Sequence, residues 1–315
     1  MGPTASGKSA LGISIAKRCG GAILNADAMQ CYRGLRIITA RPSEQEVAQA
    51  PHYLYGMWSA RTHGNVALWQ AAAVAQIQAC HDAGQVPILL GGTGMYIKGL
   101  TEGLSPVPPI SEEVKRQVAA LSCRLHDGIR TPSCDGVTKL YEALQCYDPR
   151  IAKKLDAGDS QRIARALEVV LETGKSLLDW QAESAPAPFA AKQCHFAYLD
   201  IDRETLYPRI NARFDAMMEA GALEEVRALK AYFNDDEIAQ KRFPILKSHG
   251  VPELMAYLDG QMALEDALEK GKQNTRNYAK RQLTWLRGQV SGAQPLAPNA
   301  SGAEIDAWLQ SCTLT

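Results

Sequence analysis

The first nine residues of the chain carry a motif that can hold linked phosphates. The P-loop spacing G-x-x-x-x-G-K-S is filled by Gly2, Gly7, Lys8 and Ser9. Glycines let successive backbone N–H groups point at one anion, and the helix that follows adds its positive end. The lysine offers a charge to the outer phosphates, and the serine hydroxyl can ligate Mg²⁺. We therefore predict a diphosphate or triphosphate site formed by Gly2, Pro3, Thr4, Ala5, Ser6, Gly7, Lys8 and Ser9.

A carboxylate and a hydroxyl follow two predicted strands. The apolar run 22–24 is typical of a buried strand and leads to Asp27, at the sheet edge where ligands bind in open α/β folds. Asp27 is a candidate general base, although a solvated turn residue would look the same. Strand 86–90 leads into Gly-Gly-Thr-Gly around Thr93, where NTPases that work by hydrolysis usually place an aspartate. This argues against a hydrolase, and Thr93 could serve a phosphate or simply belong to a tight turn.

Basic side chains gather on two predicted helices. Arg209 and Arg213, one turn apart, could clamp a second phosphate or form an ordinary surface pair. The segment 272–287 has no acidic residue, which indicates an anionic partner, polyphosphate or nucleic acid, more than a solvated helix. Its basic residues are Lys272, Arg276, Lys280, Arg281 and Arg287.

The pattern of helices and strands predicts an α/β fold, a P-loop NTPase-like parallel sheet flanked by helices, with an inserted all-helical domain. Before the insertion we expect helices 8–19 and 66–83, a short helix opened by a Ser43–Glu46 capping box, and strands 22–24, 53–55 and 86–90. The insertion shows helical signals from 111, over 137–146 and over 161–173, and no convincing strand. After it we expect strand 196–201 and helices 203–218, 272–287 and 303–309.

Four regions follow from this pattern: a first core half 1–102, the insertion 103–190, a second core half 191–290 and a tail 291–315. A P-loop normally follows a buried strand, and only Met1 precedes Gly2. Our hypothesis is that the natural start lies upstream or that the chain is shortened. Adding an apolar strand of about six residues should then raise stability and activity.

Composition limits the partners. Lys plus Arg and Asp plus Glu both number 34, so any surface for nucleic acid must be local. The eight cysteines are scattered without a C-x-x-C pair, which is typical of a reduced, cytoplasmic protein. The sequence has no apolar run long enough to span a bilayer, so we expect no membrane partner.

Four blocks of the sequence resemble those of the tRNA dimethylallyltransferases, in the same order and over nearly the whole chain. They are the P-loop, 25–35, 91–96 and 275–285. The resemblance implies transfer of the dimethylallyl group of dimethylallyl diphosphate to N6 of the adenosine 3′ of the anticodon, in tRNAs that read codons beginning with U. It implies Mg²⁺ as cofactor, held by Ser9, and the anticodon stem-loop of tRNA as partner of what we expect to be a monomer.

The resemblance also implies roles for individual residues. The P-loop, with Lys8, would hold the diphosphate together with Thr93 and Arg213, and Asp27 would accept a proton from the attacking amine. The acceptor base must leave its stack to reach them. Residues expected to contact tRNA are Asp27, Ala28, Met29, Gln30, Thr93, Gln161, Arg162, Ile163, Ala164, Arg165 and Lys247.

The sequence departs from the family at four positions near the expected acceptor site. Ala28 replaces a usual serine, Arg36 and Ile38 replace Asp and Gly, and Arg41 replaces Lys. Substrate preference and rate are the properties these changes would affect. No zinc-finger pattern of the eukaryotic kind follows the basic helix, which suggests a bacterial-type enzyme.

Three alternatives remain open from the sequence. The resemblance implies that the helical insertion grips the anticodon stem-loop. An adenylate isopentenyltransferase would use the same core on a free nucleotide and would need no such insertion. A small-molecule P-loop kinase would use Asp27 to position an acceptor hydroxyl. A tRNA-binding module without activity would bind the stem-loop and turn nothing over.

Overall fold

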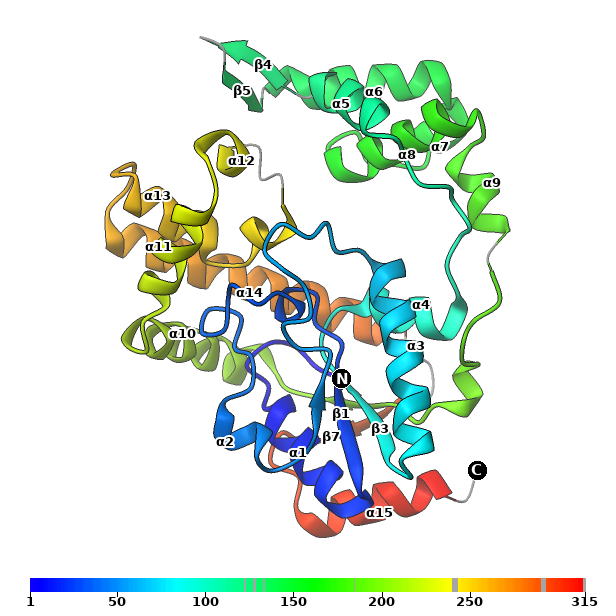
Figure 1. Cartoon of the computed structure of the whole chain (residues 1–315), viewed down its shortest axis with the longest axis vertical. Coiled ribbons are helices and arrows are strands. Elements are labelled where there is room, and N and C mark those ends of the chain that lie inside the picture. Colours follow the sequence, from blue (N-terminus) through cyan, green and yellow to red (C-terminus); the bar gives the residue numbers. More distant parts are fainter. Residues whose placement is uncertain are drawn as a thin grey trace. The chain divides into compact units, whose positions relative to one another are not determined.

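β1, Gly21–Asn25, is the fully buried centre of a three-stranded parallel sheet. β3, Val86–Leu90, lies beside β1 (Figure 1), and β2, His52–Tyr53, pairs along the other side of β1. In this register Ile23 lies opposite both His52 and Ile88. The computed structural model describes residues 1–121, 123–126, 129–132, 134–183, 185–239, 243–289 and 293–313. The parallel order confirms the predicted α/β class.

Two strands differ in detail from the prediction. β2 lies at 52–53 rather than 53–55, because Leu54 turns the chain with a φ of 67°. β3 is half-buried rather than buried, with Val86 46% exposed, because it lies at an edge of this sheet. Strand β1 is thus the buried strand that leads the chain toward Asp27.

Helices cover both faces of β1. α1, Lys8–Cys19, packs against Ile23, whereas α3, Val66–Asp82, packs Trp69 in the same cluster as Leu24. Successive side chains of a strand point to opposite faces, so α1 and α3 lie on opposite sides of the sheet. α2, Glu44–Val47, and α4, Gly94–Glu102, complete this half.

The predicted helix ends are confirmed where local capping groups mark them. Gly7 and Gly20 flank α1 with φ values of 95° and 64°, which glycine adopts without strain. Ser43 and Glu46 form the expected capping box, and the Asn65 side chain caps α3.

Two further strands form a second parallel sheet, which lies beside Met1 in space. β6, Ala197–Leu199, pairs with β7, Gln294–Leu296. The Met1 carbonyl accepts the Leu199 N–H at 2.8 Å, so the first residue runs beside β6. β6 is shorter than the predicted 196–201, and β7 was not predicted because three residues in a Pro- and Ala-rich stretch carry no strand periodicity.

The remaining helices of this unit follow β6. α10, Arg203–Glu219, packs on α14, Leu264–Gln289, which also packs on α13, Val251–Leu258. α14 begins eight residues before the predicted 272, because the basic stretch 272–287 that indicated the helix does not include the acidic residues of its first turn. The others are α11, Ala222–Tyr232, α12, Asp235–Ala239, η3, Pro244–Lys247, and α15, Gly302–Thr313.

The chain divides into two compact units, one of Met1–Thr101 with Pro188–Thr315 and one of Glu102–Ala187. The second unit contains α5, Glu112–Leu121, α6, Cys134–Tyr147, α7, Pro149–Ala152, α8, Ser160–Thr173, and α9, Leu177–Ala182. It also contains the antiparallel strands β4, Cys123–His126, and β5, Ile129–Pro132. The prediction of an insertion without strands was therefore wrong. The missed signal was an Asp-Gly pair between the two segments, which is typical of two-residue hairpins.

Candidate active site

The P-loop backbone is curled around a cavity of about 410 Å³, which we call the P-loop cavity. Ala5 and Gly7 have φ values of 60° and 95°, the left-handed turns that bring successive N–H groups to one side. The Lys8 ammonium donates to the Pro3 carbonyl at 2.6 Å. The fully buried Ser6 hydroxyl has no hydrogen-bond partner among the described residues. A buried donor and a buried cation are therefore available to an anion in this loop.

Lys8 and Arg213 bring two partly desolvated cations to the P-loop cavity. Burial lowers the pKa of Lys8 to about 8; the nearby Asp27 opposes this and Arg213 adds to it. Burial also lowers the pKa of Arg213, against the opposing charges of Glu46 and Asp27. Each cation thus loses hydration that an anionic ligand would replace.

Asp27 is held in a fixed position after β1. The buried Asn25 side chain accepts the Asp27 N–H at 2.9 Å and donates to the Asp27 carbonyl at 2.9 Å. Asp27 Oδ1 accepts the Met29 N–H at 3.0 Å. Its Oδ2 receives no hydrogen bond from the described part of the chain, so this carboxylate can accept a proton from a ligand.

The loop 91–94 packs so closely against its neighbours that three of its positions leave no room for a Cβ and therefore require glycine. A Cβ on Gly91 would overlap the Ala26 backbone, one on Gly92 the Gln282 amide, and one on Gly94 the Trp285 ring. Thr93 Oγ1 accepts the Ala28 N–H at 3.0 Å. The tight turn expected from the sequence is confirmed, and the contact of the Thr93 hydroxyl with a phosphate stays a prediction.

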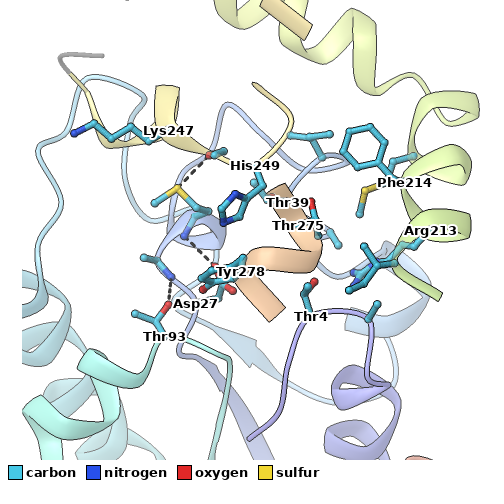
Figure 2. Close-up of a pocket in the computed structure, with 18 residues that line it drawn as sticks. Thr4, Asp27, Thr39, Thr93, Arg213, Phe214, Lys247, His249, Thr275 and Tyr278 are labelled. Carbon is cyan, nitrogen blue, oxygen red and sulfur yellow. Dashed lines mark hydrogen bonds between the residues drawn. The ribbon is translucent and has the colours of Figure 1, made fainter. Parts of the chain in front are cut away.

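A second cavity, of about 250 Å³, adjoins the first, and we call it the apolar cavity (Figure 2). Figure 2 shows Arg213 and Thr4 on the right of it and Asp27, Thr93 and Tyr278 on the left. The two cavities share the lining residues Thr4, Ala5, Asp27, Thr39 and Arg213. A ligand could therefore reach from one into the other past the Asp27 carboxylate.

Helix α10 gives the two cavities opposite character. Its Arg209 lines the P-loop cavity alone, and Arg213 lines both. Ile210, Phe214 and Met217 line the apolar cavity. One helix face therefore offers cations and, beside them, an apolar wall, which matches a ligand with an anionic head and a short hydrocarbon tail.

His249 and Tyr278 form an aromatic wall of the apolar cavity that sequence reasoning did not assign. Their rings lie 4.5 Å apart with a 40° tilt. Burial, and then Arg281, lowers the pKa of His249, while Glu253 and Asp27 oppose the shift, so the imidazole is neutral at neutral pH. Burial raises the pKa of Tyr278, and Asp27 adds to the effect. A signal was present, since Tyr278 lies in the block 275–285 that carries the family resemblance and His249 lies two residues after Lys247, which the resemblance assigned to tRNA.

The comparisons with known proteins agree with this geometry. A sequence model of the family described as IPP transferase matches residues 30–289. The chain belongs to this family. A tRNA dimethylallyltransferase of Nitrobacter hamburgensis is 45% identical over 304 residues, which cover 96% of this chain and 91% of that protein.

Solved structures extend the likeness of this IPP transferase family member to the fold. A full-length tRNA isopentenylpyrophosphate transferase from Bacillus halodurans is 29% identical with a TM-score of 0.66, covering 99% of this chain and 96% of that one. A eukaryotic dimethylallyltransferase, described as acting on tRNA, is 26% identical with a TM-score of 0.76 and covers 99% and 76%.

In this IPP transferase family member, the segment 161–165 does not present every predicted residue to solvent. Gln161, Arg162 and Arg165 are exposed on α8. Ile163 is 0% exposed in the core of the second unit, and Ala164 is partly buried against that core. The side chain of Ile163 therefore belongs to the apolar stripe of the helix, and the exposed side chains that this segment can offer to RNA are those of Gln161, Arg162 and Arg165.

The two exposed arginines of α8 have acidic neighbours on their own helix turn. Arg162 lies 3.3 Å from Asp159, and Arg165 lies 3.7 Å from Glu168. Such exposed pairs are weak, so both guanidinium groups remain available to phosphates.

The predicted tRNA contacts of the first unit lie around the apolar cavity. Ala28, Met29 and the exposed Lys247 line it. Gln30 lies at the P-loop cavity, and its amide donates to the carbonyls of Thr39 and Ala40. Gln30 thus braces the loop that both cavities share.

The four departures from the family have different surroundings. Ile38 lines the apolar cavity. Arg36 lies 3.6 Å from Glu44, and Arg41 donates to the backbone carbonyls of residues 32 and 33. Ala28 and Ile38 are therefore the two departures that change the cavity wall.

The basic face predicted on α14 is partly neutralised by acids outside the predicted segment. Lys272 lies 2.6 Å from Asp215 of α10, and Arg276 lies 2.7 Å from Glu269. Part of the positive charge predicted for this face is therefore offset within the fold, and its contact with an anionic partner stays a prediction. Lys280, Arg281 and Arg287 are exposed, although Arg287 lies 4.0 Å from Asp200.

The P-loop cavity offers oxygen ligands that suit Mg²⁺. Ser9, at the start of α1, shares the cavity with Asp27 and Glu46. Mg²⁺ bound to phosphates usually keeps several waters and takes only one or two protein oxygens, so this donor set fits it. No group of three or more His, Cys, Asp or Glu suited to a metal occurs among the described residues. Within the same residues, none of the helices has the length and apolar character needed to cross a bilayer.

Proposed function

We propose that this protein is a tRNA dimethylallyltransferase, which transfers the dimethylallyl group of dimethylallyl diphosphate to N6 of the adenosine 3′ of the anticodon. The observation that carries the proposal is the pair of adjoining cavities, one cationic and one apolar, with Asp27 in the wall of both. Its relative from Nitrobacter hamburgensis bears the name of this activity.

The diphosphate head occupies the P-loop cavity. There the loop N–H groups, Lys8 and Arg213 stabilise the negative charge that grows on the leaving diphosphate as the bond between C1 and oxygen breaks. Mg²⁺ beside Ser9 supplies further positive charge to the same oxygens when it is bound. The bound diphosphate in return stabilises the charged forms of Lys8 and Arg213, because its negative charge offsets the desolvation that lowers the pKa of Lys8.

The acceptor adenosine reaches the apolar cavity as a flipped-out base. Its N6 attacks C1 of the prenyl group, which lies along Ile210 and Phe214. Asp27 Oδ2 accepts the proton that N6 loses, so the base leaves as a neutral, prenylated adenine. The anticodon stem-loop is gripped elsewhere by the exposed arginines of α8.

We further propose that the protein works as a monomer in the cytoplasm. A tRNA substrate and eight scattered cysteines fit that compartment.

The test offers labelled dimethylallyl diphosphate and Mg²⁺ with an anticodon stem-loop, with AMP or with neither, and analyses the nucleosides by mass spectrometry. We expect label in N6-(dimethylallyl)adenosine from the stem-loop. A stem-loop with guanosine in place of the acceptor adenosine is the control and should take no label. Label in AMP alone would identify an adenylate isopentenyltransferase, and binding of the stem-loop without transfer would identify an inactive module.

A further inference from the structure

Gln282 lies between the P-loop and the loop 91–94, which both line the P-loop cavity, although neither loop is near it in sequence. It belongs to α14 and is only 5% exposed. Its Oε1 accepts the Thr4 N–H of the P-loop at 2.8 Å, and its Nε2 donates to the Gly92 carbonyl at 3.0 Å. One side-chain amide thus uses an acceptor on one loop and a donor on the other.

The peptide group between Pro3 and Thr4 is held at both of its polar atoms. Lys8 Nζ donates to the Pro3 carbonyl at 2.6 Å, while Gln282 accepts the Thr4 N–H. Because the peptide is planar, fixing its N–H direction also fixes the carbonyl on which the Lys8 ammonium rests. The orientation of Lys8 therefore depends on Gln282.

The same amide supports the loop that carries Thr93. The amide fills the space above Gly92 so closely that a Cβ there would overlap it, and Trp285, three residues on, packs likewise on Gly94. Burial raises the pKa of Tyr278, and the neighbouring side chains of Thr93 and Gln282 oppose the rise. The position of the Thr93 hydroxyl is thus tied to the same face of α14.

We propose that Gln282 is a positioning residue that holds the P-loop and the Thr93 loop in register, so that Lys8 and Thr93 meet one diphosphate. The proposal rests on the proposed function for its substrate, but diphosphate binding tests it without turnover. Gln282 contacts neither of the reacting groups. Its effect passes through the two backbone groups that it binds.

The experiment measures inorganic diphosphate binding by calorimetry with Mg²⁺, and steady-state kinetics with dimethylallyl diphosphate and a stem-loop. Gln282→Met removes both hydrogen bonds at similar length and leaves two buried backbone groups unpaired. We expect diphosphate affinity to fall about tenfold or more and the KM for dimethylallyl diphosphate to rise likewise, with stem-loop affinity unchanged. Thr284→Ala, on the exposed side of the same helix, is the matched control and should change none of these.

A second variant separates positioning from simple loss of packing. In Gln282→Glu the ionised carboxylate can still accept the Thr4 N–H but repels the Gly92 carbonyl, whereas the protonated acid can also donate to it. Burial favours the neutral acid, so activity relative to the native protein should rise as pH is lowered from about 8 to about 6.

Two results would overturn the proposal: a folded Gln282→Met variant that binds diphosphate as the native protein does, or a Gln282→Glu variant whose relative activity is independent of pH. Failure of the native protein to prenylate the stem-loop would instead remove the proposed function. The diphosphate measurement would still decide the role of Gln282.

Discussion

Replacing the P-loop lysine should make the free protein more stable while it weakens ligand binding. Burial lowers the pKa of Lys8 from 10.5 to about 8, and each pKa unit corresponds to about 1.4 kcal/mol, so the buried ammonium costs about 3 kcal/mol at neutral pH. Lys8→Met removes this cost but also the hydrogen bond from the charged ammonium to Pro3, worth about 1.5–3 kcal/mol. We therefore expect the free energy of unfolding to rise by up to about 1.5 kcal/mol at pH 7.

The stability that Lys8→Met gains over the native protein should decrease as pH rises above about 8. Below about pH 8 Lys8 is charged in both the folded and unfolded states, and the full cost applies. Between about 8 and 10.5 the folded state binds fewer protons than the unfolded state, so the native protein gains stability as pH rises. The advantage of Lys8→Met should shrink across this window.

Urea denaturation at several pH values, together with calorimetry of diphosphate with Mg²⁺, measures both effects. Diphosphate affinity should fall about 30- to 100-fold in Lys8→Met, because a charged contact is lost in a buried site. Lys17→Met, on the exposed face of the same helix, is the control and should stay within about 0.5 kcal/mol. A Lys8→Met protein less stable than the native one at pH 7 would refute the burial argument.

Three further substitutions test the rest of the site. Asp27→Asn should lower kcat at least about 100-fold with stem-loop affinity little changed, because the amide cannot accept the proton; near-native turnover in a rapid-quench assay would exclude the general base. Arg162→Ala combined with Arg165→Ala should weaken stem-loop binding and reduce its salt dependence in a filter-binding titration, and an unchanged salt slope would show that neither arginine contacts phosphate. Gly94→Ala should lower the thermal unfolding midpoint and raise the KM for dimethylallyl diphosphate, since its Cβ would overlap Trp285; native values for both would mean that the loop adjusts freely.

The sequence alone determined what depends on neighbouring residues. The P-loop spacing, the helix-capping side chains of Ser43 and Asn65, and the glycine that ends α1 each act within about one helical turn, and the structure has all of them as expected. The buried strand before Asp27 was likewise visible as an apolar run. Such signals are readable because the groups that satisfy each other lie a few residues apart.

Charge on α14 could not be judged from its own segment. The stretch 272–287 contains no acid, yet Lys272 pairs with Asp215, which lies on another helix. Ile163 was likewise taken with the arginines around it, although its side chain lies in the core of the second unit. In both cases the role of a residue depends on neighbours that tertiary packing brings to it, and these neighbours lie outside the sequence segment in which the residue stands.

The tertiary structure also decided how the loops of the site are held. Thr4 and Gln282 are 278 residues apart in the chain but share a hydrogen bond of 2.8 Å. The sequence predicted both loops as diphosphate contacts, because backbone curvature and phosphate chemistry require particular residue types there. Only the tertiary structure places α14 against those loops. A buried N–H and a buried carbonyl must each have a partner, and the side chain that packs against them in the fold provides it.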